Sequence, residues 1–263
     1  MARTKKPKVD DSSTDLNDAD EIKMKHSLKN AGFNLLELML GFSLGLLLIL
    51  GFFSLYISLK SNYLLIQAYS RIQENERFIF QIISQFRMAG LAICESKDNP
   101  VIMPPVIGYT SENLPNDLEG QVKWGTDVIT VSSCFSNLSG AAGSVSKTSY
   151  FIGDSHRKNS VGKEIFSLYE KVDNQDRAEL VEGVDDMHIT YELNQSDSSH
   201  FVSADTVQDW SQVSGVHLEI LLNSVEPILK ESQPYYFNSE KVLSHDHLLY
   251  QSLDYVVALR EKM

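Results

Sequence analysis

Residues 33–59 read FNLLELMLGFSLGLLLILGFFSLYISL, an apolar stretch in which Glu37 is the single charged side chain. A helix over this stretch is about 40 Å long at ~1.5 Å per residue, enough to cross a ~30 Å hydrocarbon core. The stretch is also longer than the roughly 7–15 apolar residues of a secretory signal peptide. We therefore expect a membrane-spanning helix over residues 33–59.

The charges that flank the apolar stretch predict its orientation. Lys23, Lys25 and Lys29 lie just before it, whereas Lys60 and Arg71 follow it more sparsely. Because lysine and arginine accumulate on the cytoplasmic side of a membrane helix, we expect a cytoplasmic N-terminus. The C-terminal part of the chain would then lie on the other side of the membrane, in the periplasm.

The residues before the apolar stretch have no apolar periodicity. A basic cluster near the N-terminus is followed by an acidic, polar stretch, which is the composition of a disordered tail. Met24 offers a second start to the chain besides Met1, and it would leave a compact basic leader, residues 24–32. We therefore expect residues 1–32 to form a leader, of which residues 1–23 are either disordered or not translated.

The helical pattern continues beyond the apolar stretch. Apolar side chains recur at spacings of three and four, interrupted by Glu76, which predicts an amphipathic helix that packs on a domain. The predicted stripe consists of Leu65, Tyr69, Ile72, Glu76, Ile79, Ile83 and Phe86, widened by Phe78 and Ile82. No proline interrupts residues 33–91, and Gly90 lies near the expected end of the helix, so we assign the amphipathic part to residues 60–92.

Alternating apolar residues predict strands in residues 93–263. The clearest are Val216, Leu218, Ile220 and Leu222 on one face of residues 213–222, and Leu253, Tyr255, Val257 and Leu259 near the C-terminus. Shorter candidates are residues 127–132, 149–152, 165–169 and 187–193. Residues 95–120, 136–147 and 194–212 are expected to be long loops. The predicted fold is α+β, with an antiparallel sheet packed on the helix stripe.

Cys94 and Cys134 are the two cysteines of the chain. Their spacing contains no Cys-x-x-Cys, so it gives no support to a zinc ribbon or a thioredoxin site. In an oxidising compartment the two would form one structural disulfide, and two buried free thiols are the alternative.

Composition and motifs argue against several classes of function. The net charge of −12 and the pI near 5.0 are unlike those of proteins that bind nucleic acid directly. His245-Asp246-His247 and Asp185-Asp186 are weak metal candidates because neither belongs to a recognisable ligand loop. There is no Gly-rich phosphate loop and no Gly-x-Ser-x-Gly. We therefore predict no enzymatic activity, no cofactor, no metal and no small-molecule substrate.

Glu37 gives the apolar stretch a possible function beyond anchoring. A carboxylate in a bilayer costs roughly 2.5–3.5 kcal/mol on insertion scales, so it requires a partner. Cleavage after Gly32 would create a free amine on Phe33, which could pair with Glu37 of a neighbouring subunit. The alternative is a glutamate that lies at the lipid headgroups without such a partner.

Residues 32–38, GFNLLEL, resemble the class III signal sequence of type IV prepilins and type II secretion pseudopilins. This resemblance implies cleavage between Gly32 and Phe33 by prepilin peptidase, N-methylation of Phe33, and a role for Glu37 in subunit assembly. Asn34 departs from the threonine that is usual in the family.

Further motifs resemble the PilW family of minor pilins. They are residues 71–78 (RIQENERF), 86–90 (FRMAG) with Cys94, 125–131 (GTDVITV), 180–187 (LVEGVDDM) and 257–260 (VALR). The resemblance implies a long helix packed on a β-rich domain, and a subunit that first resides in the inner membrane and then in the filament or its tip. It further implies that prepilin peptidase, other minor pilins and the major pilin are partners in pilus assembly, adhesion or motility. A J-type minor pseudopilin of type II secretion is the nearest alternative, and a single-span membrane-anchored protein is a more distant one.

Overall fold

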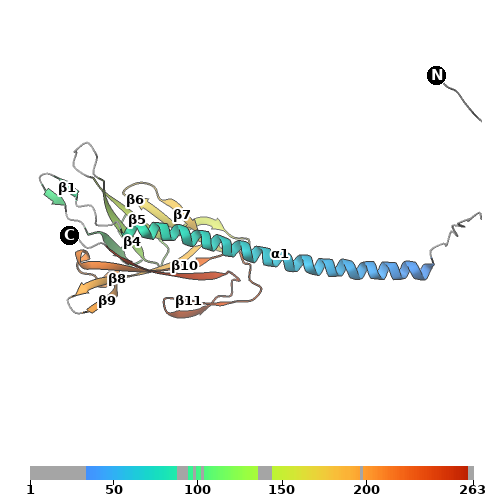
Figure 1. Cartoon of the computed structure of the whole chain (residues 1–263). Helices are drawn as coiled ribbons and strands as arrows, with labels where there is room; N and C mark the ends of the chain where they lie inside the picture. The colour runs from blue at the N-terminus through green and yellow to red at the C-terminus, as the bar shows by residue number, and fades with distance from the viewer. Residues whose placement is uncertain are drawn as a thin grey trace, which may run out of the picture. The chain divides into compact units, whose positions relative to one another are not determined.

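The computed structural model describes residues 34–87, 94–96, 99–101, 104–135, 144–195 and 198–259. The chain divides into two compact units, residues 1–53 and 54–263. The helix α1 (Leu35–Phe86) begins in the first unit and ends in the second (Figure 1). The predicted leader, residues 1–32, lies outside the described residues.

Strands dominate the second unit. They are β1 (Cys94–Ser96), β2 (Asn99–Val101), β3 (Val106–Tyr109), β4 (Val128–Phe135), β5 (Ser144–Lys158), β6 (Glu164–Val172), β7 (Ala178–Glu182), β8 (Val184–Gln195), β9 (Ser198–Ser203), β10 (Val213–Asn223), β11 (Pro234–Phe237), β12 (Glu240–Leu243) and β13 (Tyr250–Ala258). Two short 3-10 helices, η1 (Ala204–Thr206) and η2 (Trp210–Gln212), lie between β9 and β10.

The strands form two main antiparallel sheets. Sheet I has the order β3-β4-β5-β6-β7, and sheet II has the order β13-β10-β8-β9. The pairs β1–β2 and β11–β12 form two small additional sheets. Every neighbouring pair in the two main sheets is antiparallel, and long connections join β3 to β4 and β10 to β13.

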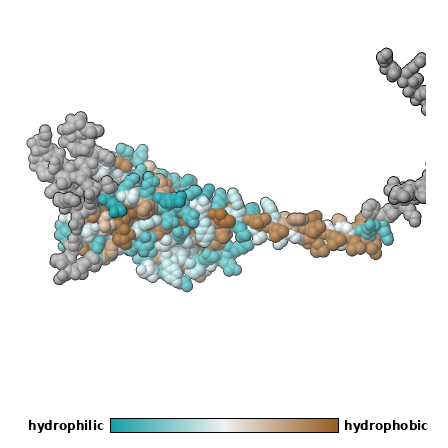
Figure 2. Space-filling model, viewed as in Figure 1, coloured by the Kyte–Doolittle hydropathy of each residue, from teal (hydrophilic) through white to brown (hydrophobic). Residues whose placement is uncertain are grey.

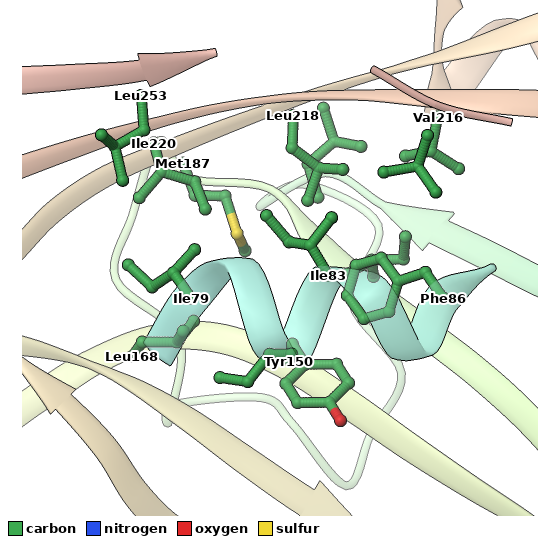
Figure 3. Packing of buried hydrophobic residues seen from close by; sticks show 14 of the residues in the cluster. Ile79, Ile83, Phe86, Tyr150, Leu168, Met187, Val216, Leu218, Ile220 and Leu253 are labelled. Atoms are coloured by element: carbon green, nitrogen blue, oxygen red, sulfur yellow. The ribbon is translucent and has the colours of Figure 1, made fainter. Parts of the chain in front are cut away.

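The C-terminal part of α1 packs between the two sheets. Figure 3 shows Ile79 and Ile83 with Leu168 of sheet I on one side and Met187 and Ile220 of sheet II on the other. The buried residues of α1 are Ala68, Ile72, Ile79, Ile82, Ile83 and Phe86. One hydrophobic core therefore joins the helix to both sheets, because neither sheet alone buries the whole apolar stripe.

A tight turn at Gly183 connects the two sheets. Gly183 separates β7 of sheet I from β8 of sheet II; its N–H donates to Phe166 O at 3.0 Å and its carbonyl accepts from Asn223 N at 2.8 Å. The side chain of Asn75 on α1 donates to Glu182 O at 3.0 Å. The helix and both sheets are thus tied together at one point of the chain.

The predicted α+β fold, a long apolar N-terminal helix with an antiparallel β-domain, is confirmed. All six predicted strand regions are strands, although the β-domain contains two main sheets where a single sheet was expected. Two of the predicted loops contain strands: residues 95–120 include β1, β2 and β3, and residues 194–212 include β9. The expectation of a loop over residues 136–147 is wrong at its end, because β5 starts at Ser144; residues 136–143 lie outside the described part of the chain.

The helix stripe was predicted with the right period and a small error in its width. Ile72, Ile79, Ile82, Ile83 and Phe86 are buried as expected, but Tyr69 is 43% exposed and Phe78 is 41% exposed. Phe78 lies outside the stripe because the buried face continues from Ile72 to Ile79 and then to Ile82 and Ile83, on the opposite edge. The structure describes α1 as far as Phe86, before the expected end at residue 92.

Candidate functional site

The first candidate site is the N-terminal part of α1, residues 34–53. The helix begins where the carbonyl of Asn34 accepts hydrogen bonds from Glu37 N at 2.9 Å and Leu38 N at 3.1 Å. Glu37 therefore lies in the first turn, where the free N–H groups of a helix favour a negative charge. It is the only acidic or basic side chain in this part of the helix.

The apolar side chains of residues 35–53 are exposed around the whole circumference of the helix. In Figure 2 the projecting part of the helix is mostly brown, with paler residues between the brown ones. In the described residues α1 is the one helix that is long and apolar enough to cross a membrane. A monomer in water rarely exposes an apolar surface of this size, so lipid or other helices must cover it.

Three glycines interrupt the large side chains of this part of the helix. A Cβ atom added at Gly41, Gly45 or Gly51 would meet no atom within 4 Å. Gly41 and Gly45 have the Gly-x-x-x-Gly spacing that allows close approach of two membrane helices. The helix thus offers both apolar surface and positions where another backbone can come near.

Other residues proposed from the sequence are only partly visible. Gly32 and Phe33 lie outside the described residues, so the cleavage position stays a prediction. Cys94 is in β1 and Cys134 in β4, but the described part of the chain does not include their side chains. The disulfide between them is therefore untested as well.

The residues suggested as weak metal ligands have other partners. Oδ2 of Asp246 accepts hydrogen bonds from Lys163 Nζ at 2.6 Å and from Tyr250 OH at 2.6 Å. Partial burial works to raise the pKa of Asp246, but these hydrogen bonds outweigh it and hold the pKa below its usual range. Asp185 pairs with Lys123 Nζ at 3.0 Å. In the described residues there is no cluster of three acidic, histidine or cysteine side chains that could hold a metal ion.

A second structural feature, which the sequence did not reveal, is an ion pair between the sheets. Oδ2 of Asp127, just before β4, accepts from Ile189 N at 2.8 Å and lies 3.1 Å from Nδ1 of His188 in β8. The hydrogen bond to Asp127 outweighs desolvation and raises the pKa of the His188 imidazole. The motif at residues 125–131 thus links sheet I to sheet II.

A third feature is a groove of about 660 Å³ beside α1. Its lining includes Gln73, Glu76, Arg77 and Phe80 from the helix and Tyr255 from β13. The rings of Phe80 and Tyr255 lie 6.0 Å apart. Burial, followed by the proximity of Glu76, raises the pKa of Tyr255, so the phenol stays neutral at physiological pH.

Comparison with known families gives one result. Residues 149–261 match the family model described as Type IV Pilus-assembly protein W. The C-terminal part of the chain is therefore similar to the PilW family, in agreement with the resemblance of the sequence motifs. A search of curated proteins and a search of solved structures found no match.

The PilW match covers most of β5 and everything from β6 to β13. It therefore contains the turn at Gly183 and the whole of sheet II. The description of the family connects the chain with type IV pilus assembly. The exposed apolar helix with its single carboxylate lies outside the matched region, and its interpretation rests on the structure and the sequence alone.

Proposed function

We propose that this chain is a minor pilin of the PilW family that takes part in assembling a type IV pilus. The observation that carries the proposal is the apolar part of α1, exposed on all sides and charged only at Glu37. A permanent membrane anchor needs no carboxylate in its first turn, whereas a subunit that leaves the membrane for a filament can use one to recognise its neighbour. The match to a pilus-assembly family supports the same conclusion.

The proposed mechanism has two steps. Prepilin peptidase cuts between Gly32 and Phe33 on the cytoplasmic side and methylates the new amine of Phe33, which keeps its positive charge. The apolar helix then moves from the bilayer into the filament core, where the amine of one subunit pairs with Glu37 of another. Pairing offsets the roughly 2.5–3.5 kcal/mol that an isolated charge costs within the membrane.

The proposed location follows from this mechanism. The chain is first a single-pass protein of the inner membrane, with its N-terminus in the cytoplasm and its β-domain in the periplasm. It then enters the filament or its tip, with other minor pilins and the major pilin as neighbours. The chemical role is structural, and it rests on packing of helices and on one charge pair.

N-terminal sequencing and intact mass test the cleavage step. The protein is purified from membranes of cells with and without prepilin peptidase. We expect a mature chain that starts at N-methylated Phe33 only when the peptidase is present. An N-terminus that is the same in both strains would contradict the proposal and leave the protein as a membrane-anchored domain.

Substitution of Glu37 tests the assembly step. We expect Glu37→Ala, present as the only copy, to keep cleavage but to lower the number of pili roughly tenfold or more, because the amine is left without its partner. Glu112→Ala, which removes an exposed carboxylate of the β-domain, is the control and should leave pili unchanged. Normal piliation with Glu37→Ala would rule out the charge pair.

A further inference from the structure

Residues 54–67 of α1 lie between the apolar part of the helix and its buried stripe, and none of their side chains is buried. Ala68 is the first buried residue of α1. Lys60 is the single charged side chain in this segment and the first one after Glu37. The β-domain therefore leaves the segment uncovered in the described residues, and a partner from outside would meet one positive charge there.

Lys60 lies between two tyrosines on one face of the helix. Tyr56 precedes it by four positions and Tyr63 follows it by three, which is the spacing of neighbours on a helix surface. The side chains of Tyr56 and Tyr63 are 63% and 65% exposed. In the part of the chain that the structure describes, none of the three side chains has a hydrogen-bond or ion-pair partner. Together they form an open surface, which we call the Tyr-Lys-Tyr face.

The Tyr-Lys-Tyr face is not the face of α1 that packs on the β-domain. Successive residues of an α-helix are rotated by about 100°, so Ala68 lies about 140° around the helix from Tyr63. Ile72 and Ile79 continue the buried side that begins at Ala68. Because the hydrophobic core follows that side of the helix, a partner of the Tyr-Lys-Tyr face must come from outside the domain.

The position of Lys60 in the sequence indicates what that partner is. The 22 uncharged positions from 38 to 59 separate Glu37 from Lys60, and at ~1.5 Å per residue they extend over about 33 Å. This length is close to the ~30 Å of a bilayer's hydrocarbon core. Lys60 therefore follows directly where a spanning helix leaves the hydrocarbon, and its aliphatic stem allows the ammonium to reach the headgroups. The next residues, Ser61 and Asn62, are polar, as expected at this depth.

The chemistry of the Tyr-Lys-Tyr face matches that of a phospholipid headgroup. The ammonium of Lys60 complements the negative charge of a phosphate, and no carboxylate in residues 54–67 competes for it. A tyrosine combines an apolar ring with a hydroxyl that can donate to phosphate or ester oxygens, and tyrosines are enriched at membrane surfaces. Tyr56 lies about 6 Å along the helix axis before Lys60, on the hydrocarbon side, and Tyr63 lies beyond Lys60 on the water side.

We propose that the Tyr-Lys-Tyr face binds phospholipid headgroups of the leaflet at the C-terminal end of the apolar stretch. The ammonium of Lys60 pairs with a lipid phosphate, while the ring of Tyr56 packs against the upper acyl chains and the hydroxyl of Tyr63 lies among the headgroups. The inference goes beyond the proposed function, with which it shares only the spanning helix, because it gives a lipid partner to residues that play no part in the charge pair at Glu37.

Photo-crosslinking of the full chain in its native membranes tests the lipid contact. Benzoylphenylalanine replaces Tyr63 in one variant and Tyr236 of β11 in a matched control; both tyrosines are 65% exposed. After irradiation, intact mass should show a phospholipid adduct at position 63 roughly tenfold or more above that at position 236. An adduct with protein only at position 63, or lipid adducts that do not exceed the control, would overturn the proposal.

Substitution of Lys60 tests the pairing with phosphate. The purified full chain with the crosslinker at position 63 is placed in vesicles that contain equal amounts of anionic phosphatidylglycerol and zwitterionic phosphatidylcholine. We expect phosphatidylglycerol adducts to exceed phosphatidylcholine adducts roughly fivefold, as one lysine near an anionic surface allows. Lys60→Gln should lower this ratio to about one, and Lys230→Gln, which alters an exposed lysine of the β-domain, should leave it unchanged. A ratio that is the same in Lys60→Gln, or that falls equally in Lys230→Gln, would refute the pairing.

The two proposals fail in distinguishable ways. If the pilin function is wrong, the N-terminus stays uncut and pili are unaffected by Glu37→Ala, while the phospholipid adduct at position 63 persists. If only the lipid contact is wrong, cleavage and membrane location persist and position 63 gives no phospholipid adduct above the control.

Discussion

Two parts of the same helix, residues 34–53 and residues 68–86 of α1, use apolar side chains in different ways. In the first part apolar residues surround the helix, and all of the large ones are exposed. In the second part the buried residues recur every three or four positions, with polar residues between them. The pattern of apolar residues, more than their number, therefore decides whether a helix packs on its own domain or requires an external partner.

The consequence is a division of roles along one helix. The stripe from Ala68 to Phe86 closes the hydrophobic core between sheets I and II. The earlier part contributes nothing to that core, and its surface is available to lipid or to other subunits. Substitutions in the second part should thus change folding, and those in the first should change location and assembly.

Two phenylalanines of α1 provide the largest expected contrast. Phe86 is 2% exposed and its ring lies 5.4 Å from that of Tyr150, whereas Phe78 is largely outside the core. We expect Phe86→Ala to lower the free energy of unfolding by about 3–5 kcal/mol, because it leaves a cavity. Phe78→Ala should cost less than about 1 kcal/mol. Urea unfolding of the detergent-solubilised chain, followed by tryptophan fluorescence, measures both; similar losses would contradict the assigned stripe.

A charge placed in residues 34–53 should change membrane retention and leave the stability of the β-domain unchanged. We expect Leu47→Arg to weaken membrane retention, because an arginine at the centre of a spanning helix costs about 2.5–3.5 kcal/mol on insertion scales. Ile66→Arg, at an exposed position of α1 beyond the predicted span, should have little effect. Carbonate extraction of membranes measures retention for each variant. If Leu47→Arg instead unfolded the β-domain, residues 34–53 would have to contribute to its core.

Substitution of Gly183 tests whether the turn between sheets I and II limits the stability of the β-domain. Gly183 has φ of +79°, and an added Cβ would lie 2.9 Å from both Asn223 O and Val225 Cγ2. Gly162 has φ of +83°, but a Cβ there would meet no atom within 4 Å. We expect Gly162→Ala to cost about 1 kcal/mol for the backbone strain alone, and Gly183→Ala to cost about 2–3 kcal/mol. Thermal unfolding compares the two, and equal losses would show that the turn can relax.

Much of the fold could be predicted from the sequence, because the spacing of apolar residues indicates which side chains are buried. Val216, Leu218, Ile220 and Leu222 lie at every second position and are all buried in β10, although Leu221 between them is buried as well. The short strand β3 and the edge strand β9 were missed because a few residues beside a sheet edge carry too little alternation to stand out.

Some features of the candidate sites could be predicted from the sequence, and others could not. Glu37 and the apolar stretch were evident because one charge among apolar residues is a local signal. The link between Asp127 and His188, the turn at Gly183 and the groove at Phe80 and Tyr255 depend on contacts between residues far apart in the chain. Residues 180–187 were noted for their resemblance to the PilW family, but one sequence could not show that this region joins two sheets.

The smallest expected effect is the pH dependence of the unfolding free energy that comes from His188. This effect concerns the β-domain and not the apolar part of α1. The hydrogen bond to Asp127 raises the pKa of folded His188 above 6.5, its value in the unfolded chain. This pair therefore contributes its full stabilisation below about pH 6.5, and the contribution is lost as the pH rises through the raised pKa. Because the pair is partly exposed, the loss should stay below about 1 kcal/mol.

NMR titration of the His188 imidazole measures this effect in the folded chain. We expect Asp127→Asn to lower the pKa of His188 and to flatten the change in unfolding free energy between pH 6 and pH 9. Asp254→Asn, which removes a carboxylate that bonds to His217 at 2.7 Å, should leave the His188 titration unchanged. An unaltered His188 pKa in Asp127→Asn would mean that the link between β4 and β8 depends on the backbone contact of Asp127 N with Met187 O, at 2.9 Å, and that the charge pair adds nothing to it.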